Sequence, residues 1–307
     1  MRLLTRSDFD GLACAVLLEE KGLIDEYLFV HPKDIQDGNI TVTENDILAN
    51  IPFMEGCKLW FDHHISEADR IQVNDLKYNG ASHPAPSAAQ VIWDYYGGEE
   101  SFGSHLLPLL EAVNKTDAGF LTREEEIITP DGWILLSFIM DPRTGLGRFK
   151  DYRIASYQLM MDLIGYCRKM SVEQILEIPD VKERVKRYFE QQDMFIEMLN
   201  RSCSGDQNVI INNLLEEDVI YCGNRFIVYS LFPEQNIEIR IMWSKNKKNV
   251  VFACGHSIIN RSSLTNVGEL MYQYGGGGHE YVGTCQIPPD DWEVVLKELV
   301  MKMKDDT

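Results

Sequence analysis

Leu59-Trp60-Phe61-Asp62-His63-His64 is the stretch of sequence that decides the fold. Three large apolar residues are followed directly by a carboxylate and two imidazoles. The apolar run is typical of a short buried strand, whereas the loop after a strand usually carries small turn residues. Carboxylate and imidazole groups suit divalent ions such as Mn²⁺, Zn²⁺ and Co²⁺. The stretch therefore predicts a strand whose carboxyl end carries metal-binding side chains.

The same arrangement recurs in the first 65 residues, where short β-rich runs precede polar or acidic residues. Three further runs occupy residues 2–5, 27–30 and 47–49, and an apolar helix is expected over residues 12–21. Strands that are apolar on both sides, joined by a helical crossover, indicate a mostly parallel α/β sheet. In such sheets, ligands gather outside the carboxyl ends of the strands. The polar residues predicted at this edge are Asp8, Asp10, Asn50, Asp62, His63 and His64.

The chain is expected to be helical from about residue 85 to 205 and to contain strands beyond that point. Ser171 with Gln174 and Asp180 with Glu183 match the capping-box spacing, and the second pair opens a long amphipathic helix. That helix ends near Ser204–Asp206, a loop-like cluster. Strands are predicted at residues 209–211, 225–231, 237–242 and 249–254, followed by a helix at 266–274. We therefore divide the chain into a domain over residues 1–180, a linker helix over 181–205 and a smaller domain over 206–307.

Length and charge limit the functions open to the protein. At 307 residues the chain exceeds the usual size of one hydrophobic core, so two domains are expected. The net charge is −19, from 48 acidic and 29 basic residues. It opposes binding of a long duplex nucleic acid, because such binding needs Lys and Arg to neutralise phosphates. Small anionic substrates are compatible with this charge if divalent cations and local Arg or His residues reverse the sign of the electrostatic field in a cleft.

The sequence also bears on the compartment. No apolar run approaches the ~20 residues that span a bilayer, and the early acidic residues do not fit a signal peptide. The seven cysteines form no CxxC pair and are odd in number, which indicates reduced thiols. We expect a cytoplasmic protein without a membrane partner, and a homodimer is one option for its assembly.

Asp8-Phe9-Asp10-Gly11 follows the first predicted strand. Two carboxylates on one tight turn can reach two cations, and Gly11 lets the backbone turn sharply because it has no Cβ. On its own this motif also occurs in ordinary turns. Together with Asp62-His63-His64, it indicates a metal site in preference to a buried, hydrogen-bonded His pair.

Four motifs occur in an order and spacing that resemble one family: Asp8–Gly11, Asp62–His64, Asp117 and Gly275–His279. The chain resembles the DHH/DHHA1 phosphoesterase superfamily, which includes oligoribonucleases, cyclic-dinucleotide phosphodiesterases, single-strand exonucleases and exopolyphosphatases. It is most similar to the exopolyphosphatase-related, oligoribonuclease-like branch, over nearly its whole length. The resemblance implies an α/β fold. Its N-terminal DHH domain has a mostly parallel sheet with helices on both faces, and a helical linker leads to a smaller C-terminal α/β DHHA1-like domain with a mixed sheet.

The resemblance also implies roles for single residues. The implied metal ligands are Asp8, Asp10, His63, Asp117 and Asn50, and the implied cofactor is Mn²⁺ (or Mg²⁺ or Co²⁺), as one or two ions. Asp62 would orient the metal shell, and His64 would face the phosphate or act as acid or base near the leaving group. Consecutive glycines can form an anion-binding nest, and Arg forks suit phosphate oxygens. The implied substrate-binding residues are Arg261, Gly275, Gly276, Gly277, Gly278 and His279.

Two positions depart from the family. Leu4 stands where most hydrolytic members have a His, and Asn50 stands where most have an Asp that bridges two metals; Arg6 lies where the exonuclease branch has another Asp. An amide is a neutral and poorer ligand than a carboxylate. The site is therefore either mononuclear or completed by a neighbouring segment such as His31–Asp34.

The sequence predicts a metal-dependent, DHH-family phosphoesterase, an exopolyphosphatase-like hydrolase. Its substrate would be a small phosphoester or phosphoanhydride, such as a short oligonucleotide, a nucleoside bisphosphate or polyphosphate, bound in a cleft between the two domains. The alternative is a degenerate member that binds a nucleotide or phosphate without efficient hydrolysis. Leu4 and Asn50 favour this alternative, whereas the retention of five metal-type residues favours the enzyme.

Overall fold

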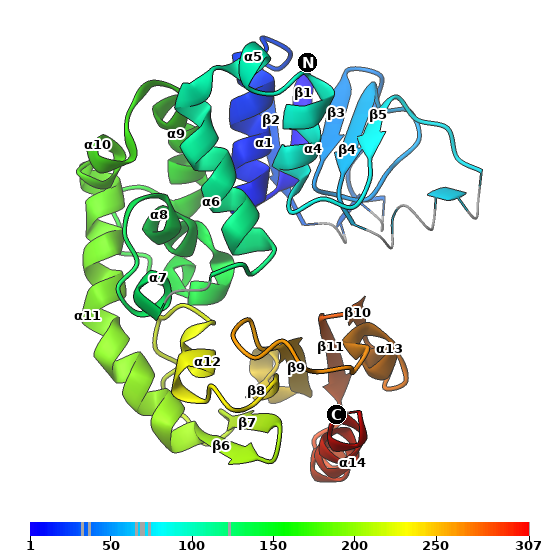
Figure 1. Cartoon of the computed structure of the whole chain (residues 1–307), viewed down its shortest axis with the longest axis vertical. Coiled ribbons are helices and arrows are strands. Elements are labelled where there is room, and N and C mark those ends of the chain that lie inside the picture. Colours follow the sequence, from blue (N-terminus) through cyan, green and yellow to red (C-terminus); the bar gives the residue numbers. More distant parts are fainter. Residues whose placement is uncertain are drawn as a thin grey trace. The chain divides into compact units, whose positions relative to one another are not determined.

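The computed structural model describes residues 1–31, 34–35, 38–64, 67, 71–72, 75–121 and 124–306 (Figure 1). It contains two compact units. The first comprises Met1–Phe120 and Pro130–Arg187, and the second comprises Leu121–Thr129 and Tyr188–Thr307. The division falls within the longest helix, α11 (Pro179–Ser202). Among the described residues, no helix is both long and apolar enough to cross a membrane.

The first unit is built on a parallel sheet. Its strands are β1 (Arg2–Arg6), β2 (Glu26–Val30), β3 (Asp46–Ala49), β4 (Leu59–Asp62) and β5 (Gly80–Ser82), in the order β2-β1-β3-β4-β5. Every neighbouring pair in it is parallel. The four strands predicted from apolar runs and the parallel α/β class are confirmed. Strand β5 was not predicted, because Gly80-Ala81-Ser82 contains no apolar run. Its extended backbone is stabilised by pairing with β4.

Both faces of this sheet are covered. On one face, α1 (Phe9–Glu20) and α4 (Ala88–Tyr95) lie side by side (Figure 1). Helix α1 is buried over ten consecutive residues, from Phe9 to Leu18, as expected of a helix that is apolar nearly all round. On the other face, strand residues such as Trp60 pack against Ile35 and Ile71, which both have helical backbone conformation. The predicted covering of both faces by helices is confirmed.

Further helices complete the first unit. They are α5 (Glu99–Phe102), α6 (Leu107–Asp117), α8 (Gly132–Met140), α9 (Ser156–Lys169), α10 (Val172–Leu176) and the short 3₁₀ turns η1 (Ser104–Leu106), η2 (Pro142–Thr144) and η3 (Leu146–Arg148). The capping box of Ser171 and Gln174 is present at the start of α10. The cap predicted at Asp180 is wrong, because α11 begins at Pro179, a residue that suits the first turn of a helix.

The second unit has a mixed six-stranded sheet. Its strands are β6 (Cys203–Asp206), β7 (Val209–Asn213), β8 (Ile237–Trp243), β9 (Val250–His256), β10 (Gly277–His279) and β11 (Val282–Ile287), in the order β10-β11-β9-β8-β7-β6. Only the β7–β8 pair is parallel. Ile237, Ile239 and Ile241 alternate into a core shared with α13 (Val267–Tyr272) and α14 (Trp292–Asp305). The remaining helical segments are α7 (Glu124–Ile128), α12 (Ile227–Leu231) and η4 (Lys245–Lys247).

Two predictions for this unit are wrong. Residues 225–231 were expected to form a strand, but α12 occupies Ile227–Leu231. The Asn224 side chain accepts a hydrogen bond from the Phe226 N–H at 2.7 Å, and this local turn overrides the β-propensity of the apolar run. Ser204–Asp206, expected to be a loop, pairs with β7 as β6. Strands β10 and β11 were not predicted.

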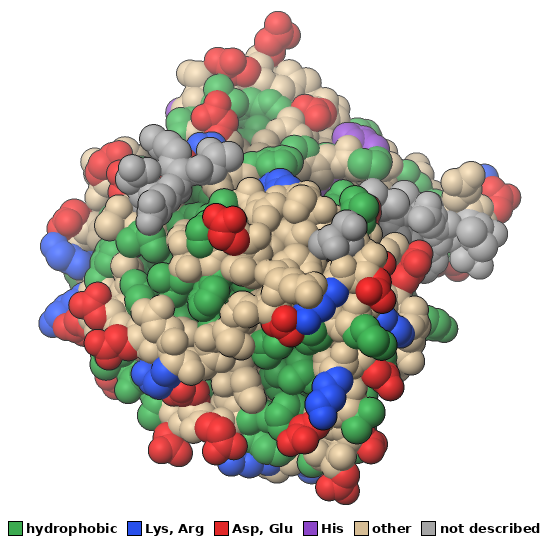
Figure 2. Space-filling view, turned by 60° about the horizontal axis from the view of Figure 1, so that its bottom comes forward, with side chains coloured by type: hydrophobic (Ala, Val, Ile, Leu, Met, Phe, Trp, Pro, Cys, Tyr) green, Lys and Arg blue, Asp and Glu red, His purple; other side chains and the backbone are tan. Residues whose placement is uncertain are grey.

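The surface carries both signs of charge. On the face shown in Figure 2, acidic side chains are interspersed with Lys, Arg and hydrophobic side chains. This mixed pattern accompanies an overall excess of acidic residues, with a net charge of −19.

The turn from β1 into α1 requires glycine at position 11, and this requirement can be tested. A Cβ on Gly11 would lie 1.9 Å from the Arg6 carbonyl oxygen. We expect Gly11→Ala to lower the free energy of unfolding by about 2 kcal/mol or more, because the backbone of β1 has to move. Chemical denaturation measures this change.

Gly165→Ala provides the matched control. Gly165 lies inside α9, and a Cβ added there would meet nothing within 4 Å, so alanine should raise stability by about 0.5–1 kcal/mol. Equal effects of the two substitutions would contradict the packing argument.

Candidate metal centre

The sheet topology gathers the predicted polar residues of the first unit at one edge. Adjacent parallel strands place the ends of β1, β3 and β4 side by side, with Thr5 opposite Ala49 and Ala49 opposite Phe61. The polar residues that follow these strand ends are Asp8, Asp10, Asn50, Asp62, His63 and His64. Their convergence follows from parallel pairing, since all the carboxyl ends then meet at one edge.

Asp10, His63 and Asp117 form a group with metal-ligand geometry. One ligand atom from each lies within 4.8 Å of the others. The His63 Nε2 atom is 3.8 Å from an Asp10 oxygen and 3.4 Å from an Asp117 oxygen. Two carboxylates and an imidazole match the donors that borderline divalent ions prefer.

Asp10 is held in place by backbone N–H groups. Its two carboxylate oxygens accept hydrogen bonds from the N–H groups of Ala88 and Ala89, each at 2.9 Å, at the start of α4. Asp10 itself lies in the first turn of α1. The carboxylate therefore sits near the positive ends of two helices, which favour negative charge. This arrangement fixes its orientation although the side chain is almost fully buried.

His63 presents a nitrogen that lacks a hydrogen-bond partner. Its Nδ1 lies 3.1 Å from the Ala85 carbonyl oxygen, which can only accept, so Nδ1 is the donor, and in the neutral imidazole Nε2 then carries the lone pair. Among the described atoms, Nε2 is buried and has no hydrogen-bond partner. A buried, unpaired acceptor between two carboxylates fits a divalent cation, which would satisfy all three groups. The Ala85 carbonyl contacts this imidazole, whereas the Asp62 carboxylate contacts His64, and the role of Asp62 in orienting the metal shell stays a prediction.

Asp117 adds negative charge at an unusual place. It is the last residue of α6, where the helix dipole disfavours a carboxylate. Burial and the nearby charge of Asp117 raise the pKa of Asp10 to about 7, against the opposing effect of His63. Burial and the carboxylate of Asp117 thus disfavour ionisation of Asp10, and a bound cation would favour it.

His64 has a different partner from His63. Its Nδ1 lies 2.8 Å from Asp62 Oδ1, and its backbone N–H donates to Asp62 Oδ2 at 3.3 Å. Burial opposes protonation of His64, but the hydrogen bond and charge of Asp62, with Asp117 and Asp10, outweigh it and raise the pKa of the imidazole. The two histidine rings lie 4.3 Å apart between centroids. The DHH triplet therefore gives one histidine with an open nitrogen and one that is held by a carboxylate.

Asp8 and Asn50 lie beside this group and contact each other. Asp8 Oδ1 accepts hydrogen bonds from the Gly11 N–H at 2.9 Å and from Asn50 Nδ2 at 3.1 Å. Asp8 Oδ2 forms an ion pair with Arg6 Nε at 3.0 Å. Asn50 has a φ of 56°, a left-handed conformation that asparagine tolerates better than most residues. Asp8 is not part of the group formed by Asp10, His63 and Asp117, and the metal-ligand roles of Asp8 and Asn50 stay predictions.

Several contributors to the site were not predicted. Arg6 was noted only as a departure from the family. Arg143, which pairs with Asp141 at 2.8 Å, lies close enough to Asp8 and Asp117 for their charges to help raise its pKa against the effect of burial. The Ala85 carbonyl carries no sequence signal at all. In the segment His31–Asp34, proposed as a substitute ligand source, Pro32 and Lys33 lie outside the described residues.

The residues predicted to bind substrate lie in the second unit. Gly277–His279 forms β10 and pairs with β11, so the glycine run is not an open loop. The N–H groups of Gly275 and Gly276 donate to the carbonyls of Tyr272 and Met271. A Cβ on Gly276 would lie 2.0 Å from the Thr284 carbonyl oxygen, which shows why glycine is needed there. The packing of the strand explains these glycines, and their contact with substrate stays a prediction.

Arg261 and His279 are both exposed. The Arg261 Nε donates to the Ile258 carbonyl at 3.2 Å. Their side chains reach the surface of the second unit, and their binding roles likewise stay predictions.

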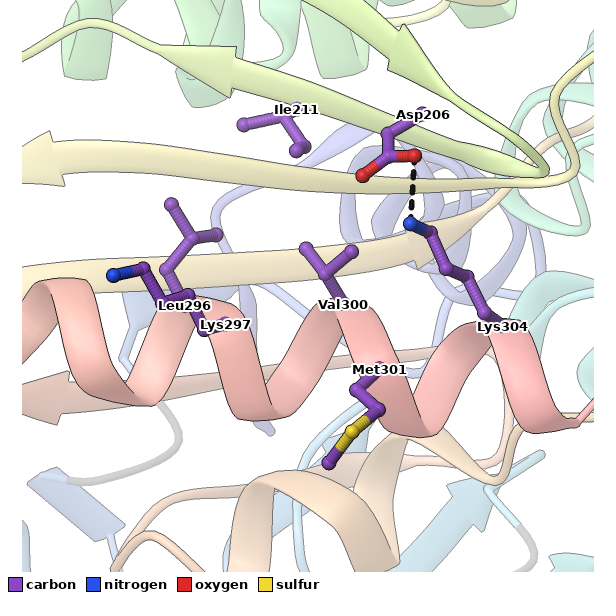
Figure 3. Close-up of a pocket in the computed structure, with 7 residues that line it drawn as sticks. All are labelled: Asp206, Ile211, Leu296, Lys297, Val300, Met301 and Lys304. Atoms are coloured by element: carbon purple, nitrogen blue, oxygen red, sulfur yellow. Dashed lines mark ion pairs between the residues drawn. The ribbon is translucent and has the colours of Figure 1, made fainter.

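A groove of about 350 Å³ in the second unit does not have the chemistry of an active site (Figure 3). It is lined by Asp206, Ile211, Leu296, Lys297, Val300, Met301 and Lys304. The one carboxylate in its lining, Asp206, forms an ion pair with Lys304 at 2.6 Å. This groove is therefore not a candidate catalytic centre.

The fold and this group define the class of protein. A parallel sheet that carries Asp-x-Asp and Asp-His-His motifs, followed by a mixed-sheet unit with GGGGH, belongs to the DHH/DHHA1 phosphoesterase superfamily. The structure of PggH, a pGpG-specific phosphodiesterase from Vibrio cholerae, matches with a TM-score of 0.85 and 47% identity, over 100% of this chain and 99% of that one. The chain is thus a metal-dependent phosphoesterase of this superfamily, and the enzyme prediction is confirmed.

More distant structures share the fold. A DHH domain described as a member of the s1p family of ribosomal proteins matches with a TM-score of 0.55 and 14% identity, over 98% of this chain and 86% of that one. An exopolyphosphatase-related protein from Bacteroides fragilis matches with a TM-score of 0.51 and 10% identity, over 99% and 92%. No protein-family model and no curated protein sequence matches the chain.

The neighbouring carboxylates of Asp10 and Asp117 should lower the stability of the metal-free protein and increase its affinity for a metal ion. Replacing Asp117 by Asn removes a like charge beside Asp10, so we expect the metal-free protein to gain about 2 °C or more in its unfolding midpoint. The same change should weaken Mn²⁺ binding by roughly tenfold or more, since a ligand carboxylate is lost. Thermal unfolding in EDTA and a calorimetric Mn²⁺ titration measure the two effects.

Glu111→Gln is the control for this substitution. Glu111 lies on the same helix and is exposed, so its replacement removes an equal charge outside the group. It should leave both quantities nearly unchanged. An Asp117→Asn protein that bound Mn²⁺ as tightly as the parent would show that Asp117 is not a ligand.

The stability of the metal-free protein should fall as the pH rises. The pKa of Asp10 is raised from 3.8 to about 7 in the folded state, so the folded protein binds this proton more tightly than the unfolded chain. Binding of this proton adds to the free energy of unfolding. The added stability is complete below about pH 4 and is lost as the pH rises through about 7. We expect the unfolding midpoint in EDTA to be lower at about pH 7.5 than at about pH 5.5, with Mn²⁺ restoring it at the higher pH. An equal midpoint at both values would contradict the raised pKa.

Proposed function

We propose that the protein is a phosphodiesterase that cleaves a short linear dinucleotide, of the pGpG class, into mononucleotides. The single observation that carries the proposal is the open Nε2 of His63, buried between the carboxylates of Asp10 and Asp117. The similarity to PggH, whose substrate is pGpG, supports the choice of substrate. A short substrate also suits a chain of net charge −19, because few phosphates then face the acidic surface.

The proposed cofactor is Mn²⁺ or a similar divalent ion, held by Asp10, His63 and Asp117. When bound, such an ion supplies Lewis-acid stabilisation of the phosphoryl group and lowers the pKa of the attacking water. The chain's own contribution is to fix the ligands. The N–H groups of Ala88 and Ala89 hold Asp10, and the Ala85 carbonyl holds His63 in the tautomer that leaves Nε2 open.

His64 is proposed as the general acid. Hydrolysis of a phosphodiester releases a ribose oxygen, which needs a proton as the bond to phosphorus breaks. The Asp62 carboxylate accepts from Nδ1 of His64 and favours the protonated imidazole, so Nε2 can deliver a proton. Asp62 acts through His64 in this scheme and orients it. Arg261 and His279 are proposed to bind the nucleotide, since exposed cationic or donor side chains suit phosphate oxygens.

A substrate panel with Mn²⁺ tests the proposal. We expect release of mononucleotide from pGpG, with much slower release of phosphate from polyphosphate or pyrophosphate. Replacing His63 by Ala should lower the rate by roughly 100-fold or more, because a metal ligand is lost.

His105→Ala is the matched control. This histidine is exposed in η1 of the same unit, and its replacement should leave the rate unchanged. Rapid phosphate release from polyphosphate with no cleavage of pGpG would overturn the substrate class. Full activity of the His63→Ala protein would overturn the site.

A further inference from the structure

Both oxygens of the Asp8 carboxylate contact protein donors. Its Oδ1 accepts from the Gly11 N–H at 2.9 Å and from Asn50 Nδ2 at 3.1 Å, and its Oδ2 pairs with Arg6 Nε at 3.0 Å. The side chain is only 13% exposed, so these contacts replace water to a large extent. Each carboxylate oxygen of Asp8 thus has a protein partner, as a buried carboxylate requires.

The donors come from neighbouring strand ends. Arg6 ends β1, and Asn50 directly follows β3, which pairs with β1 in parallel. Both side chains converge on Asp8 from this edge of the sheet. The NH₂ group of Asn50 points at Asp8, since the amide oxygen would be repelled by the carboxylate. The NH₂ group has no lone pair for a cation, so on the side that faces Asp8 the Asn50 side chain is a donor and not a ligand.

The charges of the site agree with this arrangement. A second divalent ion would need further anionic ligands beside Asp8, because hard cations are held by carboxylates and other oxygen donors. The side chains in direct contact with Asp8 are instead a neutral amide and a guanidinium with a fixed positive charge. Leu4, on β1, is fully buried in the core and offers no ligand atom.

We propose that Arg6 takes the place of a second cation and that Asp8 is its counter-ion, so that the site binds one divalent ion. This inference rests on the proposed function, because it takes Asp10, His63 and Asp117 as the ligands of that ion. Asp8 is then a positioning residue. It caps α1 and holds the guanidinium of Arg6, whose side chain is 44% exposed, beside the metal group.

A metal titration of the purified full chain tests the inference. Counting bound Mn²⁺ by equilibrium dialysis, we expect one ion per chain at saturation. Asp8→Asn should still bind one ion, with affinity within about fivefold of the parent, because asparagine keeps the helix cap and no ligand is lost. Asp117→Asn, which loses a proposed ligand, should weaken binding by roughly tenfold or more.

The outcomes separate this inference from the proposed function. Two ions per parent chain, or loss of Mn²⁺ binding in the Asp8→Asn protein while its unfolding stays cooperative, would overturn the inference alone. No bound ion in the parent chain would overturn the proposed function as well. Circular dichroism of each variant confirms that a lost ion does not reflect a lost fold.

A double substitution that should create a second metal site provides a further test. Arg6→Ala combined with Asn50→Asp removes the internal cation and adds a carboxylate at a position where Asp also tolerates the backbone conformation. We expect the count to rise from one Mn²⁺ to two. A count that stays at one would contradict the claim that Arg6 and Asn50 exclude the second ion.

Arg187→Ala is the control for the loss of an Arg–Asp pair. Arg187 binds Asp151 through two hydrogen bonds of 2.7 Å in the same unit, outside the metal group. Its replacement should leave the count at one. A second ion in this variant would show that the change in count does not depend on Arg6.

Discussion

The contact between the Asp10 carboxylate and the first N–H groups of α4 is the constraint on which the site depends. It ties the β1–α1 turn to a helix that begins almost 80 residues later in the chain. A buried carboxylate is costly unless its oxygens are satisfied, and two backbone donors at a helix start satisfy it without adding a counter-charge. The remaining charge is therefore available to a metal ion. The close approach of Gly11 to the Arg6 carbonyl makes this turn tight enough to aim Asp10 at α4.

The two histidines of the triplet differ because the Nδ1 atom of each contacts a different hydrogen-bond acceptor. A neutral carbonyl, that of Ala85, fixes His63 and leaves its Nε2 open beside the carboxylates. A charged carboxylate, Asp62, fixes His64 and favours its protonated form. Adjacent residues with the same side chain thus differ in their chemistry, because the backbone at the end of β4 directs them to different partners.

The sequence predicted much of the fold and part of the site. Apolar runs that end in polar residues located four of the five parallel strands, and the DHH triplet with Asp-x-Asp located the acidic edge. It did not predict α12, where Asn224 starts a turn that propensity does not reveal, or β5, whose Gly80-Ala81-Ser82 backbone is ordered by pairing with β4. It also missed Ala85, because any residue type supplies a carbonyl. Arg6 is charged, but no sequence pattern predicts that it pairs with Asp8.

By itself, the sequence determined the class of the protein, since motif order and hydrophobic period are properties of the chain. It also identified Asn50 and Leu4 as departures from a two-metal site. Only the tertiary structure shows what Asn50 and Arg6 contact. Asn50 and Arg6 lie 44 positions apart, and parallel pairing of β1 with β3 brings both to the same carboxylate. The partners of the Asp8 carboxylate depend on which donors the fold places at hydrogen-bond distance from it, and the order of residues along the chain does not reveal those distances.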